Sequence, residues 1–322
     1  MHTKFLSALA AGLGLLACSQ TKEAPSTVET APDDLVNLSV SVPALSTRAT
    51  AADDAAVNRF QVFVFRADGT LETGSYGADA SQTVKVSRGQ KTVAVLVNCA
   101  QITASVTATS LLSTVLNLSD NGLSSVQMYG TSSVNLSGDS SIEVEVTRLV
   151  AKIGIADITN AITLEQYKDL TMTVNGIYLI NVAGDRSIDG TAATTTWYNR
   201  MQNMSECTAL LSDRIDRTVA SGSVFEADRV FYCYPNSNAD STDQTWSPRS
   251  TRLVVEVQLG TETWYYPITV PDIRENTFYE ISGLRITRIG ATSPDEVLEF
   301  DNATFTVTVK AWEDSPVSEV TI

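Results

Sequence analysis

Histidine, cysteine and acidic side chains are the groups of this sequence from which catalysis or metal binding would start. The chain of 322 residues has one histidine, His2, together with four cysteines and 37 aspartate and glutamate residues. His2 lies in a segment that we expect to be removed, so the mature chain has no imidazole for a Ser-His pair or a histidine metal site. Carboxylate-pair hydrolysis stays open, but no pair is marked by its spacing. We predict no enzyme, no cofactor and no metal site.

Cys18 has the surroundings of a modification site. It closes an apolar run, Phe5 to Ala17, which follows Lys4 and is too short to span a bilayer. This pattern is typical of a secretory signal peptide, predicted here over residues 1–18. The tetrapeptide Leu15-Leu16-Ala17-Cys18 is similar to a bacterial lipobox, whose cysteine carries lipid after the signal is cut. Polar and acidic residues from 19 to 34 indicate a disordered tether.

The other three cysteines are Cys99, Cys207 and Cys233. An odd number excludes a complete disulfide framework. Cys99 ends an apolar run and is predicted to be a buried thiol. Cys207 and Cys233 either form a disulfide or remain two unpaired thiols.

Arg48 is a candidate site of proteolysis, placed just after a strand pattern. Apolar residues alternate with polar ones over 36–42, which predicts a strand with one buried face. The buried positions would be Val36, Leu38, Val40 and Val42. Pro43 ends the run, and the small polar residues of 46–56 indicate an exposed segment that a protease can cut. Cleavage between Arg48 and Ala49 would free the strand and leave an apolar groove.

Most of the remaining chain is predicted to form β-strands, because Val, Ser and Thr are abundant and apolar residues repeatedly alternate with polar ones. The predicted strands span 59–66, 83–86, 90–99, 141–158, 170–182, 224–234, 252–259, 263–270, 277–289 and 303–312. One short helix is predicted over 110–118. The alternation within 141–158 changes phase near Arg148, which we interpret as a boundary between domains spanning 49–148 and 149–322.

The C-terminal region carries a second strand pattern that could pair with another chain. Phe305, Val307, Val309 and Ala311 alternate, then Trp312 precedes a break at 314–316. Val320 and Ile322 are in phase within the last six residues. The region is either an ordinary edge strand of the second domain or a donor that adds to another sheet.

Charge and polar loops limit the ligands. The net charge of −15 argues against nucleic acid and anionic lipid surfaces as partners. The loop 235–249 is rich in Asn and Asp but lacks the residue order of a calcium loop. Aromatic residues at Trp197, Trp246 and Trp264 would either stack on sugars or pack within the fold.

Several motifs together carry a family resemblance. They are the lipobox at Cys18, the strand before Arg48, and the segments 89–98, 147–153, 231–236, 265–268, 274–287 and 305–313. In their order and spacing the chain resembles the Bacteroidales fimbrillins, the subunits of type V pili.

The resemblance implies two tandem transthyretin-like β-sandwich domains and an all-β fold with few short helices. It implies export as an outer-membrane lipoprotein precursor, cutting after Arg48 by an extracellular Arg-specific protease, and polymerisation with other fimbrial subunits by donor-strand exchange into an extracellular, adhesive fimbrium. The candidate donor residues are Phe305, Val307, Val309, Trp312, Val320 and Ile322. Which of the two C-terminal segments donates stays open, as does a shaft or accessory position. The alternative is a surface lipoprotein that binds glycan or host protein without polymerising.

Overall fold

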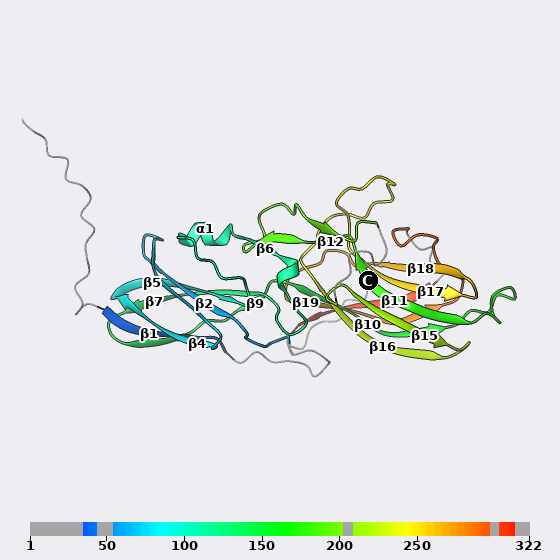
Figure 1. Ribbon diagram of the computed structural model, residues 1–322, viewed down its shortest axis with the longest axis horizontal. Coiled ribbons are helices and arrows are strands. Elements are labelled where there is room, and N and C mark those ends of the chain that lie inside the picture. Colours follow the sequence, from blue (N-terminus) through cyan, green and yellow to red (C-terminus); the bar gives the residue numbers. More distant parts are fainter. Residues whose placement is uncertain (1–34, 44–53, 202–208, 297–302, 313–322) are drawn as a thin grey trace, which may run out of the picture.

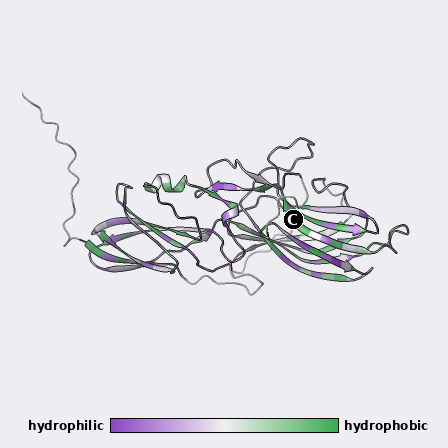
Figure 2. Ribbon diagram, in the orientation of Figure 1, coloured by the Kyte–Doolittle hydropathy of each residue, from purple (hydrophilic) through white to green (hydrophobic). Residues whose placement is uncertain are grey.

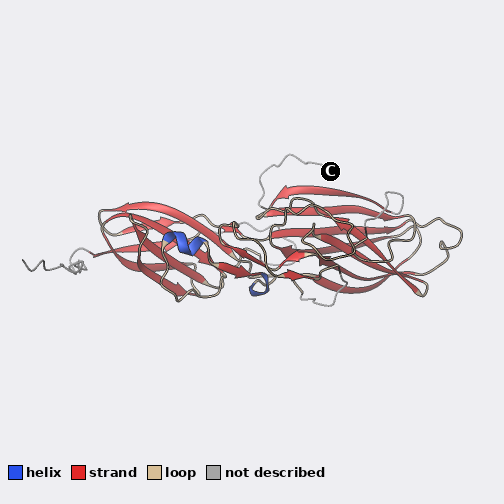
Figure 3. Cartoon of the chain, turned by 90° about the horizontal axis from the view of Figure 1, so that it is seen from above, coloured by secondary structure: helices blue, strands red, loops and turns tan. Residues whose placement is uncertain are grey.

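The computed structural model describes residues 35–43, 54–201, 209–296 and 303–312. Within them the chain is almost entirely β, and it forms two sandwich-like lobes arranged end to end (Figures 1 and 3). The all-β fold with tandem β-sandwich domains, expected from the sequence, is confirmed. None of the described helices is long and apolar enough to cross a membrane.

The first lobe packs a three-stranded sheet, ordered β4-β1-β8, against a five-stranded sheet, ordered β3-β2-β5-β7-β9. Its strands are β1 (Leu35–Ser41), β2 (Phe60–Arg66), β3 (Leu71–Gly77), β4 (Ser81–Ser87), β5 (Gly89–Val97), β6 (Val115–Asn117), β7 (Met128–Leu136), β8 (Ser140–Glu143) and β9 (Thr147–Arg148). The core lies between the two sheets, where β2 and β5 are buried along most of their length.

The second lobe has two four-stranded sheets, ordered β16-β10-β19-β20 and β15-β11-β17-β18. Its strands are β10 (Ala151–Asn160), β11 (Met172–Ile180), β12 (Val182–Ala183), β13 (Asp185–Ser187), β14 (Trp197–Tyr198), β15 (Ser212–Val219), β16 (Val224–Cys233), β17 (Arg252–Leu259), β18 (Glu262–Thr269), β19 (Thr277–Ile286) and β20 (Ala303–Ala311). Apolar and polar residues alternate along many of these strands (Figure 2), as two packed sheets with solvated outer faces require.

The segment 141–158, in which we expected the last strand of one domain to run straight into the first strand of the next, is interrupted after Glu143 and after Arg148. The segment forms β8, β9 and β10, which belong to three different sheets. The apolar alternation nevertheless continues from β8 to β9. Val144 and Val146 lie between these strands, but both side chains are buried. The chain passes from the first group of sheets to the second between Arg148 and Ala151.

The predicted helix over 110–118 is also partly wrong. Helix α1 spans Ala108–Leu112 and starts at a capping box in which Thr107 and Ser110 satisfy each other's backbone amides. The chain then forms β6, which pairs with β13 of the second lobe, and a 3-10 turn, η2 (Leu118–Asp120). Pairing with a distant strand therefore decides the conformation of residues whose apolar spacing also suits a helix.

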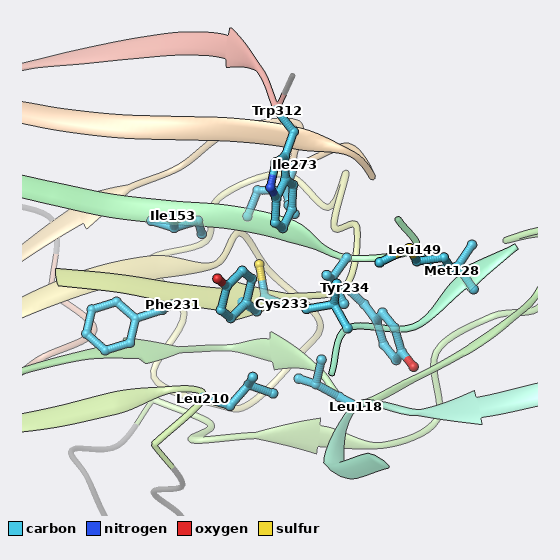
Figure 4. Close-up of a cluster of buried hydrophobic side chains, with 14 of the residues drawn as sticks. Leu118, Met128, Leu149, Ile153, Leu210, Phe231, Cys233, Tyr234, Ile273 and Trp312 are labelled. Carbon is cyan, nitrogen blue, oxygen red and sulfur yellow. The ribbon is translucent and has the colours of Figure 1, made fainter. Parts of the chain in front are cut away.

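The two lobes meet in a tight junction. Besides the β6–β13 pairing, the Leu118 amide donates to the Gly184 carbonyl at 2.8 Å. Arg186 Nη1 donates to the Leu149 carbonyl at 2.8 Å, and the Tyr234 hydroxyl donates to Gln127 Oε1. Figure 4 shows apolar side chains of both lobes gathered here, from Leu118 and Met128 to Phe231 and Trp312. The junction is a continuation of the hydrophobic core.

Candidate assembly site

Strand β1 is the central strand of its sheet, which makes it a structural part of the first lobe. It pairs antiparallel with β4, from Leu35 opposite Ser87 to Ser41 opposite Ser81. On its other side it pairs parallel with β8, from Leu38 opposite Ser140 onward. β4 and β8 have no direct pairing in the described sheet, so β1 alone joins them.

The inner face of β1 is buried as the alternation predicts. Leu38 and Val40 have no exposed surface, Val36 is 4% exposed, and Val42 just after the strand is 9% exposed. Burial of an aliphatic side chain stabilises by about 1.5–3 kcal/mol, so the four together contribute about 6–12 kcal/mol as an upper estimate. This is comparable to the whole stability of an ordinary domain.

The outer face of β1 is fixed by polar contacts. Asp139, just before β8, accepts from the Asn37 backbone amide at 2.8 Å and from Asn37 Nδ2 at 3.1 Å. The hydroxyls of Ser39 and Thr83 lie 2.9 Å apart. The backbone and side-chain hydrogen bonds from Asn37 lower the pKa of Asp139. Asp139 therefore holds the start of β1 beside the start of β8.

Several predicted site residues fall outside the described residues. These are Cys18, Cys207, Arg48, Ala49, Val320 and Ile322. The described chain resumes at Asp54, six residues after Arg48 in the sequence. Cys99 and Cys233 are buried free thiols, and burial raises the pKa of each to about 12.

Strand β20 lies at the edge of its sheet and pairs only with β19 among the described strands. Val307 is buried and Val309 is partly buried against the core. Phe305, which alternates with these two valines, is 39% exposed. The register shifts between Ser282 and Arg285, at a bulge that includes Gly283 with φ +62°, and Phe305 faces this irregular part of β19.

Trp312, directly after β20, is buried rather than presented to solvent. Its ring stacks on Tyr232 with centroids 5.6 Å apart, and its Nε1 donates to Asp54 Oδ2 at 3.2 Å. In Figure 4 the indole points from the end of β20 into the apolar cluster of the junction. Sequence reasoning missed Asp54 altogether, although Arg148 and Lys152, charged residues inside an apolar run, were a sign of a buried polar partner.

The aromatic residues considered for sugar stacking are mostly occupied by protein contacts. Trp197 is buried and meets Trp246 edge to face at 5.7 Å. The guanidinium groups of Arg200 and Arg249 each lie 5.6 Å from the Trp246 ring centre. Within the described ranges no three His, Cys, Asp or Glu side chains gather as a metal site.

A family model and solved structures of similar fold both point to fimbrial proteins. The family model of the major fimbrial subunit protein (FimA) matches residues 36–198, just over half of the chain. No curated protein matches the sequence.

Solved structures share the fold over most of the chain. A cell adhesion protein from Bacteroides eggerthii matches with a TM-score of 0.66 at 19% identity, covering 87% of this chain and 96% of that one. A fimbrilin (FimA) from Porphyromonas gingivalis matches with a TM-score of 0.62 at 16% identity, covering 86% and 97%. The tip fimbrial protein Mfa3 from Porphyromonas gingivalis matches with a TM-score of 0.50 at 13% identity, covering 85% and 99%.

Proposed function

The chain belongs to the family of the major fimbrial subunit protein (FimA), a family of structural subunits rather than enzymes, and we propose how this subunit assembles. It is exported as an outer-membrane lipoprotein precursor with lipid on Cys18. An extracellular Arg-specific protease then cuts between Arg48 and Ala49. The cut frees β1, and the C-terminal strand of a neighbouring subunit takes its place.

The observation that carries this proposal is the position of β1. A strand with a hydrogen-bonded neighbour on each side and four buried apolar side chains directly precedes the segment with Arg48. Its departure would leave unpaired backbone groups on both β4 and β8 beside an open apolar groove. Such a groove is suited to β-strand addition, in which main-chain bonds give affinity and alternate side chains give specificity.

The covalent connection explains why the precursor would stay monomeric. While β1 belongs to the same chain, it competes with any donor strand at a high effective concentration. Cleavage after Arg48 removes that advantage, so a strand of another subunit can compete. A contact in which one subunit's end fills the next subunit's groove is head-to-tail and does not close, so it yields a filament.

The decisive experiment treats the purified precursor with an Arg-specific protease and follows intact mass and migration in detergent gels. We expect a new N-terminus at Ala49 and a ladder of detergent-resistant oligomers. The Arg48→Ala variant should give neither. Arg88→Ala, which changes an arginine in an exposed turn between β4 and β5, is the matched control and should assemble normally.

A clean cut at Arg48 that leaves a stable monomer would contradict donor-strand assembly. It would favour the alternative of a surface lipoprotein that binds glycan or host protein. That alternative predicts glycan binding that is lost in Trp246→Ala or Trp264→Ala.

Membrane attachment of the precursor is tested separately at Cys18. In cells, Cys18→Ala should abolish incorporation of labelled fatty acid and release the precursor from the outer membrane. A subunit with both a protease cleavage site and a potential donor segment could act as a shaft or adaptor subunit. The copy number of the chain in purified fibres tests this, because a single copy per fibre would contradict a shaft role.

A further inference from the structure

Asp54 and Lys152 form a buried ion pair at the junction of the lobes, between the residues that precede β2 and strand β10 of the second lobe. Lys152 Nζ donates to Asp54 Oδ2 at 2.9 Å, and the lysine and aspartate side chains are 7% and 4% exposed. Among the described residues, Asp54 is the single hydrogen-bond partner of this ammonium. An ammonium has three hydrogens to donate, so the Lys152 charge is poorly satisfied.

Aromatic rings surround the Lys152 ammonium where water would otherwise lie. Its Nζ is 5.4 Å from the ring centre of Phe278, 5.6 Å from that of Trp312 and 6.0 Å from that of Tyr232. Two ions buried in this way are costly, because their mutual attraction repays only part of the lost hydration. A neutral amide made from the same atoms would avoid most of that cost. The surroundings therefore favour condensation of the pair.

The two carboxylate oxygens of Asp54 have different partners. Besides Lys152, Oδ2 accepts from the Tyr232 hydroxyl and from Trp312 Nε1, each at 3.2 Å. Burial raises the pKa of Tyr232, so its hydroxyl keeps a proton that it can donate to Oδ2. Arg148 Nη2 lies 3.7 Å from Oδ1, where a guanidinium can stabilise the negative charge that collects on this oxygen when the carboxyl carbon is attacked.

We propose that Lys152 and Asp54 condense after folding to form an intramolecular isopeptide bond. A proton passes from the ammonium to Oδ2 along their hydrogen bond, and the Nζ lone pair then attacks the carboxyl carbon. The carbon–nitrogen bond forms, the bond between the carbon and Oδ2 breaks, and Oδ2 leaves as water with two protons that came from the ammonium. The ion pair holds every atom of the amide and of the water, so no further reactant is needed.

The bond would close a covalent ring around the first lobe. Residues 54–152 hold strands β2 to β9, so the ring would contain every described strand of this lobe except β1. Arg48 and β1 precede Asp54 in the sequence, so neither the proposed cut nor the release of β1 would open the ring. A pulling force on the first lobe would reach β10 through two covalent connections, the isopeptide bond and the backbone between β9 and β10.

Tryptic digestion of the purified precursor after denaturation tests the proposal, and it does so whether or not the protein polymerises. Trypsin cuts after arginine and after free lysine but not after an acylated lysine. We therefore expect one branched peptide made of residues 49–59 and 149–168, with their summed mass less that of one water. Recovery of the separate peptides 49–59, 149–152 and 153–168 in full yield would overturn the inference.

A second buried pair in the same chain is the matched control. Lys91 Nζ lies 2.7 Å from Glu72 Oε2, and the two side chains are 4% and 6% exposed. This ammonium also donates to Ser87 Oγ at 2.8 Å. Although burial by itself would raise it, the pKa of Glu72 is lowered by hydrogen bonds from Lys91 and Ser87. We expect this pair to stay ionic, so trypsin should cut after Lys91 in the same digest.

Lys152→Arg keeps a cation at this position but lacks the nucleophilic amine, so the branched peptide should be absent. A linked peptide 49–59 in this variant would assign the bond to another lysine and overturn the inference. A limited cut after Arg88, in the exposed turn between β4 and β5, gives a second readout. The cut lies within the ring, so the unaltered chain should remain one species in a denaturing gel, whereas Lys152→Arg should separate into two fragments. Separation of the unaltered chain would contradict the bond.

Discussion

Among the described strands, β1 has a hydrogen-bonded neighbour on each side, whereas β20 has one neighbour and lies at a sheet edge. On pairing alone, β20 would be the strand that leaves and β1 the strand that stays. The contacts at the ends of the two strands differ in the opposite sense. β1 is followed by Pro43 and the segment with the proposed cut, whereas β20 ends in a tryptophan bound to a buried carboxylate. The comparison teaches that the pairing of a strand and the contacts at its ends can differ in opposite directions.

Among the changes that test this comparison, removal of β1 should have the largest effect on stability. A chain that begins at Ala49 lacks the four buried side chains of the strand and loses about 6–12 kcal/mol of burial as an upper estimate. We expect the first lobe to lose its cooperative unfolding transition in urea. The chain that ends at Trp312 is the control and should keep the transitions of both lobes. A normal first transition without β1 would show that the strand is dispensable.

Trp312→Ala should have the next largest effect, on the second lobe. Truncation of a buried tryptophan costs about 3–5 kcal/mol, which would appear as a lower urea midpoint of that lobe. Trp312→Phe keeps an aromatic ring against Tyr232 but loses the hydrogen bond to Asp54, for a smaller loss of about 1.5–3 kcal/mol. Hydrogen exchange of the β20 amides should accelerate in the same order. Unchanged exchange in Trp312→Ala would mean that the tryptophan does not retain β20.

Core truncations on the two strands compare their contributions, although Leu38→Ala removes one more carbon atom than Val307→Ala. Leu38→Ala, in the centre of β1, should destabilise the first lobe by about 2–5 kcal/mol. Val307→Ala, on the edge strand, removes the equivalent of two methylene groups and should cost about 1.5 kcal/mol. Both are measured by urea unfolding, and Ser39→Ala on the outer face of β1 is a control. If both substitutions lowered the free energy of unfolding equally, the central strand β1 would be no more important for stability than the edge strand β20.

Asp139 should have the smallest effect, confined to the start of β1. Its folded-state pKa is lowered, so the bonds to Asn37 contribute at pH values above the ordinary aspartate pKa and are lost as the pH falls through the lowered value. Asp139→Asn should accelerate hydrogen exchange of the Asn37 amide at neutral pH. Acidification should lower the protection factor of this amide, which is the slowing of its exchange relative to an unfolded chain at the same pH, in the unaltered protein but not in the variant. If the ratio of the Asn37 exchange rates in Asp139→Asn and in the unaltered protein did not change with pH, the Asp139 carboxylate would have no role in holding the start of β1.

The sequence by itself determined the parts of this protein that depend on local alternation. Val36, Leu38, Val40 and Val42 marked β1 and its buried face, because a strand between two layers records burial at every second residue. The same signal found most strands of the second lobe and the all-β class, whereas the family resemblance depended on motifs distributed along the whole chain. The alternation signal missed β7, whose run of Thr and Ser with few large apolar residues gives no clear alternation although the strand lies between β5 and β9 in its sheet.

Only the tertiary structure showed which strands have ends fixed by contacts with distant residues. Asp54 meets Lys152, Tyr232 and Trp312 across 98, 178 and 258 positions of sequence, and no local pattern records such partners. The pairing of β6 with β13 likewise overrode a helical spacing. Alternation reports whether a side chain is buried, but the identity of its partner depends on how distant segments pack. For this reason the sequence located β1 and β20, while only the folded chain showed that β20 ends in a buried tryptophan bound to Asp54.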